Sequence, residues 1–229
     1  MIEKNRHGQF RLEECPFCSA SIAPDASDCP SCSISLAPRQ LVDWEIELLL
    51  ERKKLIIEPL LSLKGHGPDQ KDRQLGPASV DLRLDTTFRE IRLMNKPSVD
   101  LRDSQEEEEL YRLVEIDVSQ NEGYVLHPGE FVLAQSLEYV AMPNYLSGRL
   151  DGRSSYGRYG VMIHSTAGSV DPGFRGHLAF ELSNIGKMPV HLHPTDRVAR
   201  MSLFLTSKCE NPYRGKFQLQ VRIKPPIPD

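Results

Sequence analysis

From Pro77 to the C-terminus, short apolar runs alternate with turn residues at close spacing. In residues 79–85 the apolar positions Val80, Leu82 and Leu84 recur with a period of two, so we expect them to face inward and the charged residues between them to face solvent. Further strands are predicted over residues 124–126, 131–136, 161–164, 177–182, 190–192, 198–205 and 217–223. Many short strands with such punctuation favour an all-β barrel or sandwich over a doubly wound sheet.

The chain before Pro77 has a different pattern. Apolar residues recur at helical spacing from Leu41, so residues 41–57 are predicted to form an amphipathic helix that runs into a strand. Asp43 is the expected helix start, and Pro59 bars any continuation. Residues 64–75 and the acidic run 103–109 have no apolar period, and we expect both to be surface loops.

Composition narrows the class of protein. The 229 residues are 39% hydrophobic and 26% charged, which is ordinary for a soluble globular chain. A net charge of −4 gives no overall basic surplus, so a nucleic-acid partner is not expected. No apolar stretch reaches the roughly 18 residues of a membrane span. The N-terminus shows no apolar signal segment. We therefore expect a cytoplasmic protein without a membrane partner.

Four of the five cysteines form two closely spaced pairs, Cys15 with Cys18 and Cys29 with Cys32. Four thiolates at this spacing can surround one tetrahedral ion, and a segment this short cannot bury a useful core without one. We predict a structural Zn²⁺. Four cysteine ligands leave no open position for water, so a catalytic metal is not expected. A zinc-dependent base deaminase is not indicated either, because no His or Cys precedes a Glu by two positions.

A second constellation lies between residues 149 and 184. Residues 152–158 (GRSSYGR) place two guanidinium groups and two hydroxyls between glycines, and arginine suits phosphate because its planar fork bonds two oxygens. Residues 166–176 (TAGSVDPGFRG) embed Asp171, and the predicted strand 177–184 (HLAFELSN) carries Glu181. Taken singly, each piece also fits a plain surface interpretation: solvated arginines, a turn residue and a solvent-facing carboxylate.

In this order and spacing, the three pieces together resemble the dCTP deaminase family of the dUTPase superfamily. The resemblance extends from about residue 41 to residue 220. It includes the stretches IIEPL (56–60), GPASVDLR (76–83), LHPGEFVL (126–133), LEYV (137–140), PY (212–213) and KFQLQ (216–220). The four-cysteine segment is not part of the usual family domain.

The resemblance implies a mainly β fold, a distorted dUTPase-like β-barrel (jelly-roll-like) with one N-terminal helix, here preceded by a small zinc knuckle. It implies a homotrimer with active sites between subunits. Glu181 would be the proton shuttle that activates a water for attack at C4 of cytosine. Ser154, Arg158 and the backbone of Ala167 would position that water and stabilise developing charge. Mg²⁺ would accompany the nucleotide triphosphate without taking part in deamination.

The resemblance also implies a set of substrate-binding residues around the base, the deoxyribose and the triphosphate. They are Arg153, Ser154, Ser155, Arg158, Asp171, Ala179, Phe180, Glu181, Tyr213, Lys216 and Gln220.

We divide the chain into an N-terminal segment, 1–40, with a zinc-ribbon-like knuckle at 15–32, and a deaminase-like β-barrel domain, 41–229, with a C-terminal lid. The main interpretation is hydrolytic deamination of dCTP to dUTP and ammonia. One alternative is a bifunctional dCTP deaminase and dUTP diphosphatase that yields dUMP. Others are dUTPase activity alone, which the presence of Glu181 disfavours, and a non-catalytic nucleotide-sensing module. Further candidate ligands are dUTP and dTTP, and the knuckle is a candidate docking site for a protein partner.

Overall fold

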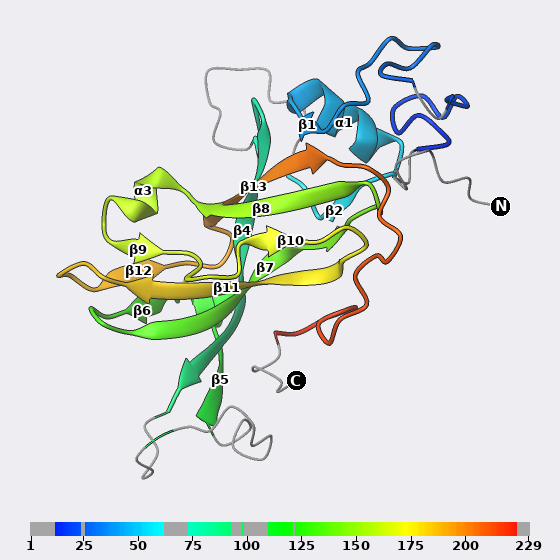
Figure 1. Cartoon of the computed structure of the whole chain (residues 1–229). Coiled ribbons are helices and arrows are strands. Elements are labelled where there is room, and N and C mark those ends of the chain that lie inside the picture. The colour runs from blue at the N-terminus through cyan, green and yellow to red at the C-terminus, as the bar shows by residue number, and fades with distance from the viewer. Residues whose placement is uncertain are drawn as a thin grey trace.

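The computed structural model describes residues 12–23, 26–61, 73–92, 98, 110–120 and 122–223, and Figure 1 shows a curled, mostly β body with the N-terminal segment at one end. The predicted loop 103–109, and residues 64–72 of the predicted loop 64–75, lie outside the described residues. None of the helices in the described ranges is long and apolar enough to span a bilayer.

The strands, in chain order, are β1 (Arg39–Gln40), β2 (Ile56–Glu58), β3 (Leu75–Gly76), β4 (Ser79–Ile91), β5 (Tyr111–Glu115), β6 (Tyr124–Leu126), β7 (Phe131–Ala141), β8 (Leu146–Gly152), β9 (Val161–Met162), β10 (Ser169–Val170), β11 (Arg175–Asn184), β12 (Val190–Leu192) and β13 (Arg197–Leu205). The helices are α1 (Asp43–Glu51), the short α3 (Ser154–Gly157) and the 3₁₀ turn η2 (Val118–Gln120).

One sheet dominates the body, with strand order β10-β8-β13-β4-β7-β11-β9, while β6 and β12 form a separate pair. Strand β4 joins the two halves, since its first part pairs with β13 and its second part with β7. The sheet therefore curls around the main hydrophobic cluster, in which Leu84 and Phe88 of β4 and Phe180 of β11 are fully buried. The predicted mainly β class is confirmed.

The polar residues of β4 do not follow the predicted alternation. Val80, Leu82 and Leu84 are buried as expected, but Asp81 and Arg83 are also only 5% exposed. Each is tolerated in the interior because it has partners of opposite charge, as burial of a charge requires. The prediction that these charged residues face solvent is wrong for both of them. Nε of Arg83 lies 2.6 Å from Oε1 of Glu138, and the ion pairs of Asp81 are described below.

Helix α1 begins at Asp43 as predicted and ends at Glu51, before a short turn leads into β2. Its buried face carries Ile46 and Leu49. Glu45 accepts a hydrogen bond from the Val42 N–H at 3.1 Å, which satisfies one of the backbone donors at the helix start.

The four cysteines lie in two similar loops. Ser19 N–H donates to the carbonyl of Cys15 at 2.9 Å, and Ser33 N–H donates to that of Cys29 at 2.8 Å. Phe17 of the first loop is fully buried and belongs to the same hydrophobic cluster as the β body. The knuckle therefore packs directly on the remainder of the chain.

The C-terminal segment differs from its prediction. Residues 217–223 were expected to form a strand, but they form a turn followed by one isolated bridge, in which Gln220 pairs parallel with Gly176 at the start of β11. The segment contacts β11, because Leu219 N–H donates to the carbonyl of Arg175 at 2.7 Å and His177 N–H donates to that of Gln220 at 2.8 Å. Residues 212–223 are called the C-terminal strap below.

Candidate functional site

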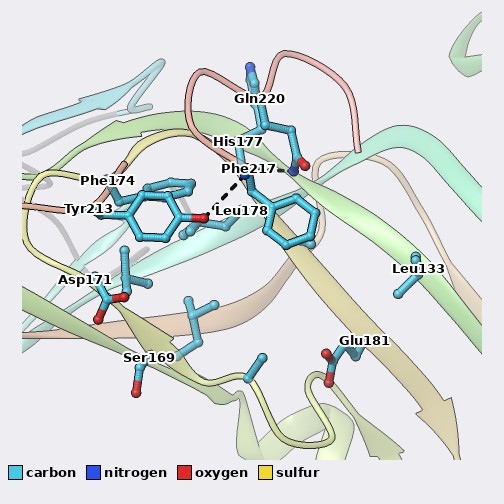
Figure 2. Close-up of a pocket in the computed structure, with 14 residues that line it drawn as sticks. Leu133, Ser169, Asp171, Phe174, His177, Leu178, Glu181, Tyr213, Phe217 and Gln220 are labelled. Carbon is cyan, nitrogen blue, oxygen red and sulfur yellow. Dashed lines mark hydrogen bonds between the residues drawn. The ribbon is translucent and has the colours of Figure 1, made fainter. Parts of the chain in front are cut away.

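A pocket of about 290 Å³ opens between β11, the loop around β10 and the C-terminal strap. Such concave, mostly apolar sites with a few convergent polar groups are the usual form of a small-ligand site. Figure 2 shows Asp171 and Glu181 on opposite sides of the pocket, with the rings of Tyr213 and Phe217 on its upper edge. The lining residues are Leu133, Leu150, Ala167, Ser169, Val170, Asp171, Phe174, His177, Leu178, Ala179, Glu181, Tyr213, Phe217 and Gln220.

Glu181 is half-buried on β11, and one of its carboxylate oxygens is held by the neighbouring loop. Its Oε2 accepts hydrogen bonds from the backbone N–H groups of Ser165 at 2.8 Å and Thr166 at 3.1 Å. Bonds of this kind fix a carboxylate in position. The same loop leads into Ala167, which also lines the pocket. A carboxylate oriented in this way can accept a proton from a water in the pocket.

A β-bulge in β7 lies against the wall opposite the loop. The register shifts between His177 and Ala179, where the single residue Leu178 of β11 opposes residues 136–138 of β7. The Ser136 hydroxyl accepts from the Leu178 N–H at 2.8 Å and donates to the carbonyl of Glu138 at 2.7 Å. Leu178 is buried in the core cluster, as alternation along β11 predicts, and it also lines the pocket.

The strap is seated against two glycines of the DPGFRG turn. Gly173 has φ +87°, and a Cβ there would lie 2.6 Å from Cβ of Pro212; Gly176 has φ +148°, and its Cβ would lie 2.9 Å from the backbone N of Gln220. Both positions therefore need glycine for backbone conformation and for close approach. Tyr213 N–H donates to the carbonyl of Pro172 at 2.8 Å, which holds the tyrosine at the pocket edge.

The pocket brings together only part of the predicted site. Six of the predicted residues line it: Ala167, Asp171, Ala179, Glu181, Tyr213 and Gln220. The other six predicted residues do not line it. Arg153, Ser154, Ser155 and Arg158 lie in and beside α3, and Lys216 is exposed on the strap. The side chain of Phe180 is fully buried in the core and likewise does not line the pocket.

The charges of the site are divided in the same way. The described lining of the pocket contains two carboxylates, Asp171 and Glu181, and no Lys or Arg. The arginines that the sequence assigned to phosphate flank α3 instead, where Arg158 is exposed and Arg153 forms an ion pair, Nε to Oδ2 of Asp81 at 3.2 Å. One copy of the chain therefore presents a base-sized pocket and, separately, a cationic surface.

The cysteine cluster has the geometry of a metal centre. All four Sγ atoms lie within 4.8 Å of one another, with Cys15–Cys32 at 3.7 Å and Cys18–Cys29 at 3.5 Å. A tetrahedral zinc with Zn–S bonds of about 2.3 Å places its sulfurs ~3.8 Å apart, so these distances fit a four-thiolate site. Among the described residues, no other group of three or more potential ligands is gathered in this way.

Comparison with known proteins identifies the family. Residues 40–206 match the family model described as dCTP deaminase-like. The chain belongs to this family. One relative, the "dCTP deaminase, dUMP-forming" of Methanothermobacter thermautotrophicus, is 40% identical over 174 residues, which are 76% of this chain and 83% of the relative. The protein with the same description from Dictyoglomus turgidum is 40% identical over 178 residues, 77% of this chain and 86% of that protein.

A solved structure of the family has the same fold. The 2′-deoxycytidine 5′-triphosphate deaminase from Agrobacterium tumefaciens aligns with a TM-score of 0.54 and 22% identity, over 73% of this chain and 47% of that chain. This chain therefore spans less than half of that protein. These findings confirm the predicted family, the dUTPase-like fold class and the prediction that the chain is an enzyme of the dCTP deaminase family.

Several pocket residues were missed from the sequence. Phe174, His177 and Phe217 line the pocket but carried no signal beyond their neighbourhood to Asp171 and Lys216. Ser136 contacts the Leu178 backbone from a strand that is distant in sequence, and only the fold shows that contact.

Proposed function

We propose that this enzyme converts dCTP to dUMP, as a bifunctional dCTP deaminase and dUTP diphosphatase. The observation that carries this proposal is the name of two relatives, "dCTP deaminase, dUMP-forming". Each is 40% identical to this chain, and the alignment covers more than four fifths of each relative's length. This supports the second sequence interpretation better than deamination to dUTP alone. The pocket supports it by placing two carboxylates, Glu181 and Asp171, on opposite walls of one cavity.

In the deamination step, Glu181 takes a proton from a water as the oxygen bonds to C4 of cytosine. The carboxyl group gives this proton to N3 of the base, then takes a second proton from the new C4 hydroxyl and passes it to the exocyclic amine. The C4–N bond breaks, and ammonia leaves as the carbonyl forms at C4. The N–H groups of Ser165 and Thr166 hold Oε2, which leaves Oε1 for this transfer. Ala167 lies beside it to position the water, with Ser154 and Arg158 as further candidates.

In the second step, a water attacks the phosphate chain of dUTP and the bond between the α- and β-phosphates breaks, giving dUMP and pyrophosphate. Asp171 is the candidate base and the candidate partner of the deoxyribose hydroxyl, because it is the second carboxylate of the pocket. Mg²⁺ would travel with the triphosphate, since it prefers phosphate oxygens and water to a dedicated protein cage.

We further propose that the active unit is a homotrimer with sites shared between copies. The pocket holds no Lys or Arg among its described lining residues, yet a triphosphate needs cations. The exposed α3 segment with Ser154, Ser155 and Arg158 would supply them from a neighbouring copy. Tyr213, Lys216 and Gln220 of the strap would close over the nucleotide, while Ala179 and the backbone of Phe180 would contact the base.

For the knuckle we propose a structural Zn²⁺ held by Cys15, Cys18, Cys29 and Cys32, on the fit of their Sγ distances. A protein partner of the knuckle remains a hypothesis.

One experiment tests the function. The purified protein is incubated with dCTP, and in a separate sample with dUTP, in the presence of Mg²⁺, and the products are resolved by anion-exchange chromatography. We expect dUMP and pyrophosphate. Accumulation of dUTP alone would return the assignment to simple deamination. Absence of product from both dCTP and dUTP would refute every enzymatic version.

A further inference from the structure

The buried carboxylate of Asp81 is surrounded by arginines. Its side chain, on β4, is 7% exposed. Oδ2 lies 3.2 Å from Nε of Arg153 and 3.7 Å from an Nη of Arg197, and Oδ1 lies 3.1 Å from Nε of Arg200. The three arginines come from β13 and from the residue that precedes α3. One carboxylate thus holds together two parts of the chain that lie far apart in sequence.

The cluster carries a surplus of positive charge. Three guanidinium groups and one carboxylate leave a net charge of +2 (3 − 1), and a guanidinium does not lose its proton in a protein. Asp151, which faces Arg200 in the strand register, does not cancel this surplus because it pairs with Arg149 at 3.7 Å. The arginine side chains are 19–48% exposed, so they can reach an anion from solvent.

Arg153 is fixed at two points. Its Nε faces Asp81, and its Nη1 donates to the carbonyl of Arg197 at 3.0 Å. Its backbone N–H donates to the carbonyl of Val198 at 3.0 Å, which ties the start of α3 to β13. Among the described residues no hydrogen bond uses Nη2, so that end of the fork is oriented but available. An arginine held in this way loses little rotamer freedom when it binds an oxyanion.

We propose that Asp81 is a positioning residue, which orients Arg153 toward the phosphate chain of a nucleotide and makes the Asp81–Arg153–Arg197 group an anion-binding unit. This inference rests on the proposed function and deepens it. Asp81 touches no nucleotide itself; it acts through Arg153. The buried location follows from this role, since a solvated carboxylate would leave the guanidinium free to turn.

Because the cluster has a surplus of positive charge, two explanations predict opposite changes in the affinity for triphosphate when Asp81 is replaced by asparagine. If Asp81 only adjusted charge, Asp81→Asn would raise the local charge and tighten triphosphate binding. If Asp81 positions Arg153, the same variant loosens binding despite the added positive charge. We expect KM for dCTP to rise about tenfold, the equivalent of one charge-assisted hydrogen bond, with kcat nearly unchanged.

A double-mutant cycle provides the decisive readout. KM for dCTP and Kd for inorganic tripolyphosphate are measured for Asp81→Asn, Arg153→Ala and the double variant, with Arg112→Ala as a matched control; Arg112 also pairs with one carboxylate, but on β5, remote from α3. We expect Asp81→Asn to have a much smaller effect once Arg153 is alanine, because only its longer contact to Arg197 and its contact to Arg200 are then left. Additive effects, or tighter binding in the single variant, would overturn the inference.

A second variant covers the case in which Asp81→Asn does not fold. Arg153→Lys keeps the charge but lacks the fork that joins Asp81, the Arg197 carbonyl and an oxyanion. We expect it to lose as much affinity as Arg153→Ala, and wild-type affinity in this variant would refute the positioning role. The two proposals fail separately: absence of turnover of dCTP removes the proposed function, whereas absence of tripolyphosphate binding to the unmodified protein removes the anion-binding unit.

Discussion

The substitution Glu181→Gln separates catalysis from structure most directly. The glutamine amide oxygen can accept the same hydrogen bonds from Ser165 and Thr166 that Oε2 accepts at 2.8 and 3.1 Å. The loop should therefore stay in place. Two charge-assisted bonds become neutral ones, and because each such change is worth about 1 kcal/mol, we expect a loss of ~1–3 kcal/mol in the free energy of unfolding.

The loss of activity should be far larger. General acid–base catalysis contributes about 10²–10⁴-fold for a proton transfer, and the same carboxylate serves both the removal and the return of protons. We expect deamination to fall about 10⁴-fold, equivalent to a barrier higher by ~5.5 kcal/mol. The amide cannot accept the proton, whereas Asp171 is unchanged, so hydrolysis of dUTP should persist in the same preparation.

The assay follows deamination of dCTP and hydrolysis of dUTP by anion-exchange chromatography, with a thermal melt of each sample. Glu130→Gln is a matched control, because Glu130 also accepts from a backbone N–H, that of His127 at 2.7 Å, but lies outside the pocket. Deamination by Glu181→Gln within about tenfold of the unmodified enzyme would show that Glu181 is not the proton shuttle.

Three further perturbations test other parts of the molecule. Gly173→Ala should raise KM, because the new Cβ would push away Pro212 and with it Tyr213, which lines the pocket. Gly129→Ala, at a similar φ of +82° with no atom within 4 Å, should carry only backbone strain of about 1–2 kcal/mol; equal KM values in the two would contradict this. Phe180→Ala should lower the free energy of unfolding by about 3–5 kcal/mol in a denaturant titration, since the side chain is fully buried, and a cost near zero would contradict its place in the core. Cys15→Ser, or a strong chelator, should release bound zinc and increase hydrogen exchange across residues 15–32, while the β body still melts cooperatively. Cys209→Ser is the control. Loss of the cooperative thermal transition of the β body would refute the division of the chain into two units.

Much of the fold could be predicted because the apolar period of two survives in the strands. Residues 124–126 and 190–192 were predicted to the residue, and Asp43 was correctly assigned as the helix start. The strap was misassigned because its alternating apolar residues do not all face a core: Leu219 and Val221 are exposed, and the backbone meets β11 at a few points and not in a continuous ladder. Such contacts depend on partners that are distant in sequence, and local pattern does not encode them.

The site shows the same division. Glu181 and Asp171 were identifiable because their motifs have a fixed order and spacing. The role of Asp81 was hidden because a charged residue at an alternating position normally faces solvent, and only the convergence of β4, β13 and α3 places three arginines around it. Whether a charged side chain is buried depends on the assembled sheet, so the alternating pattern predicted the wrong orientation for Asp81.

The separation of the pocket from the α3 arginines within one copy has a consequence for the enzyme in dilute solution. If each site needs a neighbour, specific activity falls on dilution below the assembly constant even though every chain stays folded. Two different variants could also complement each other within one mixed assembly. A copy with a damaged pocket but intact α3 arginines can complete the site of a copy with the opposite defect. Genetic dominance in such an enzyme would then depend on which half of the shared site a mutation touches.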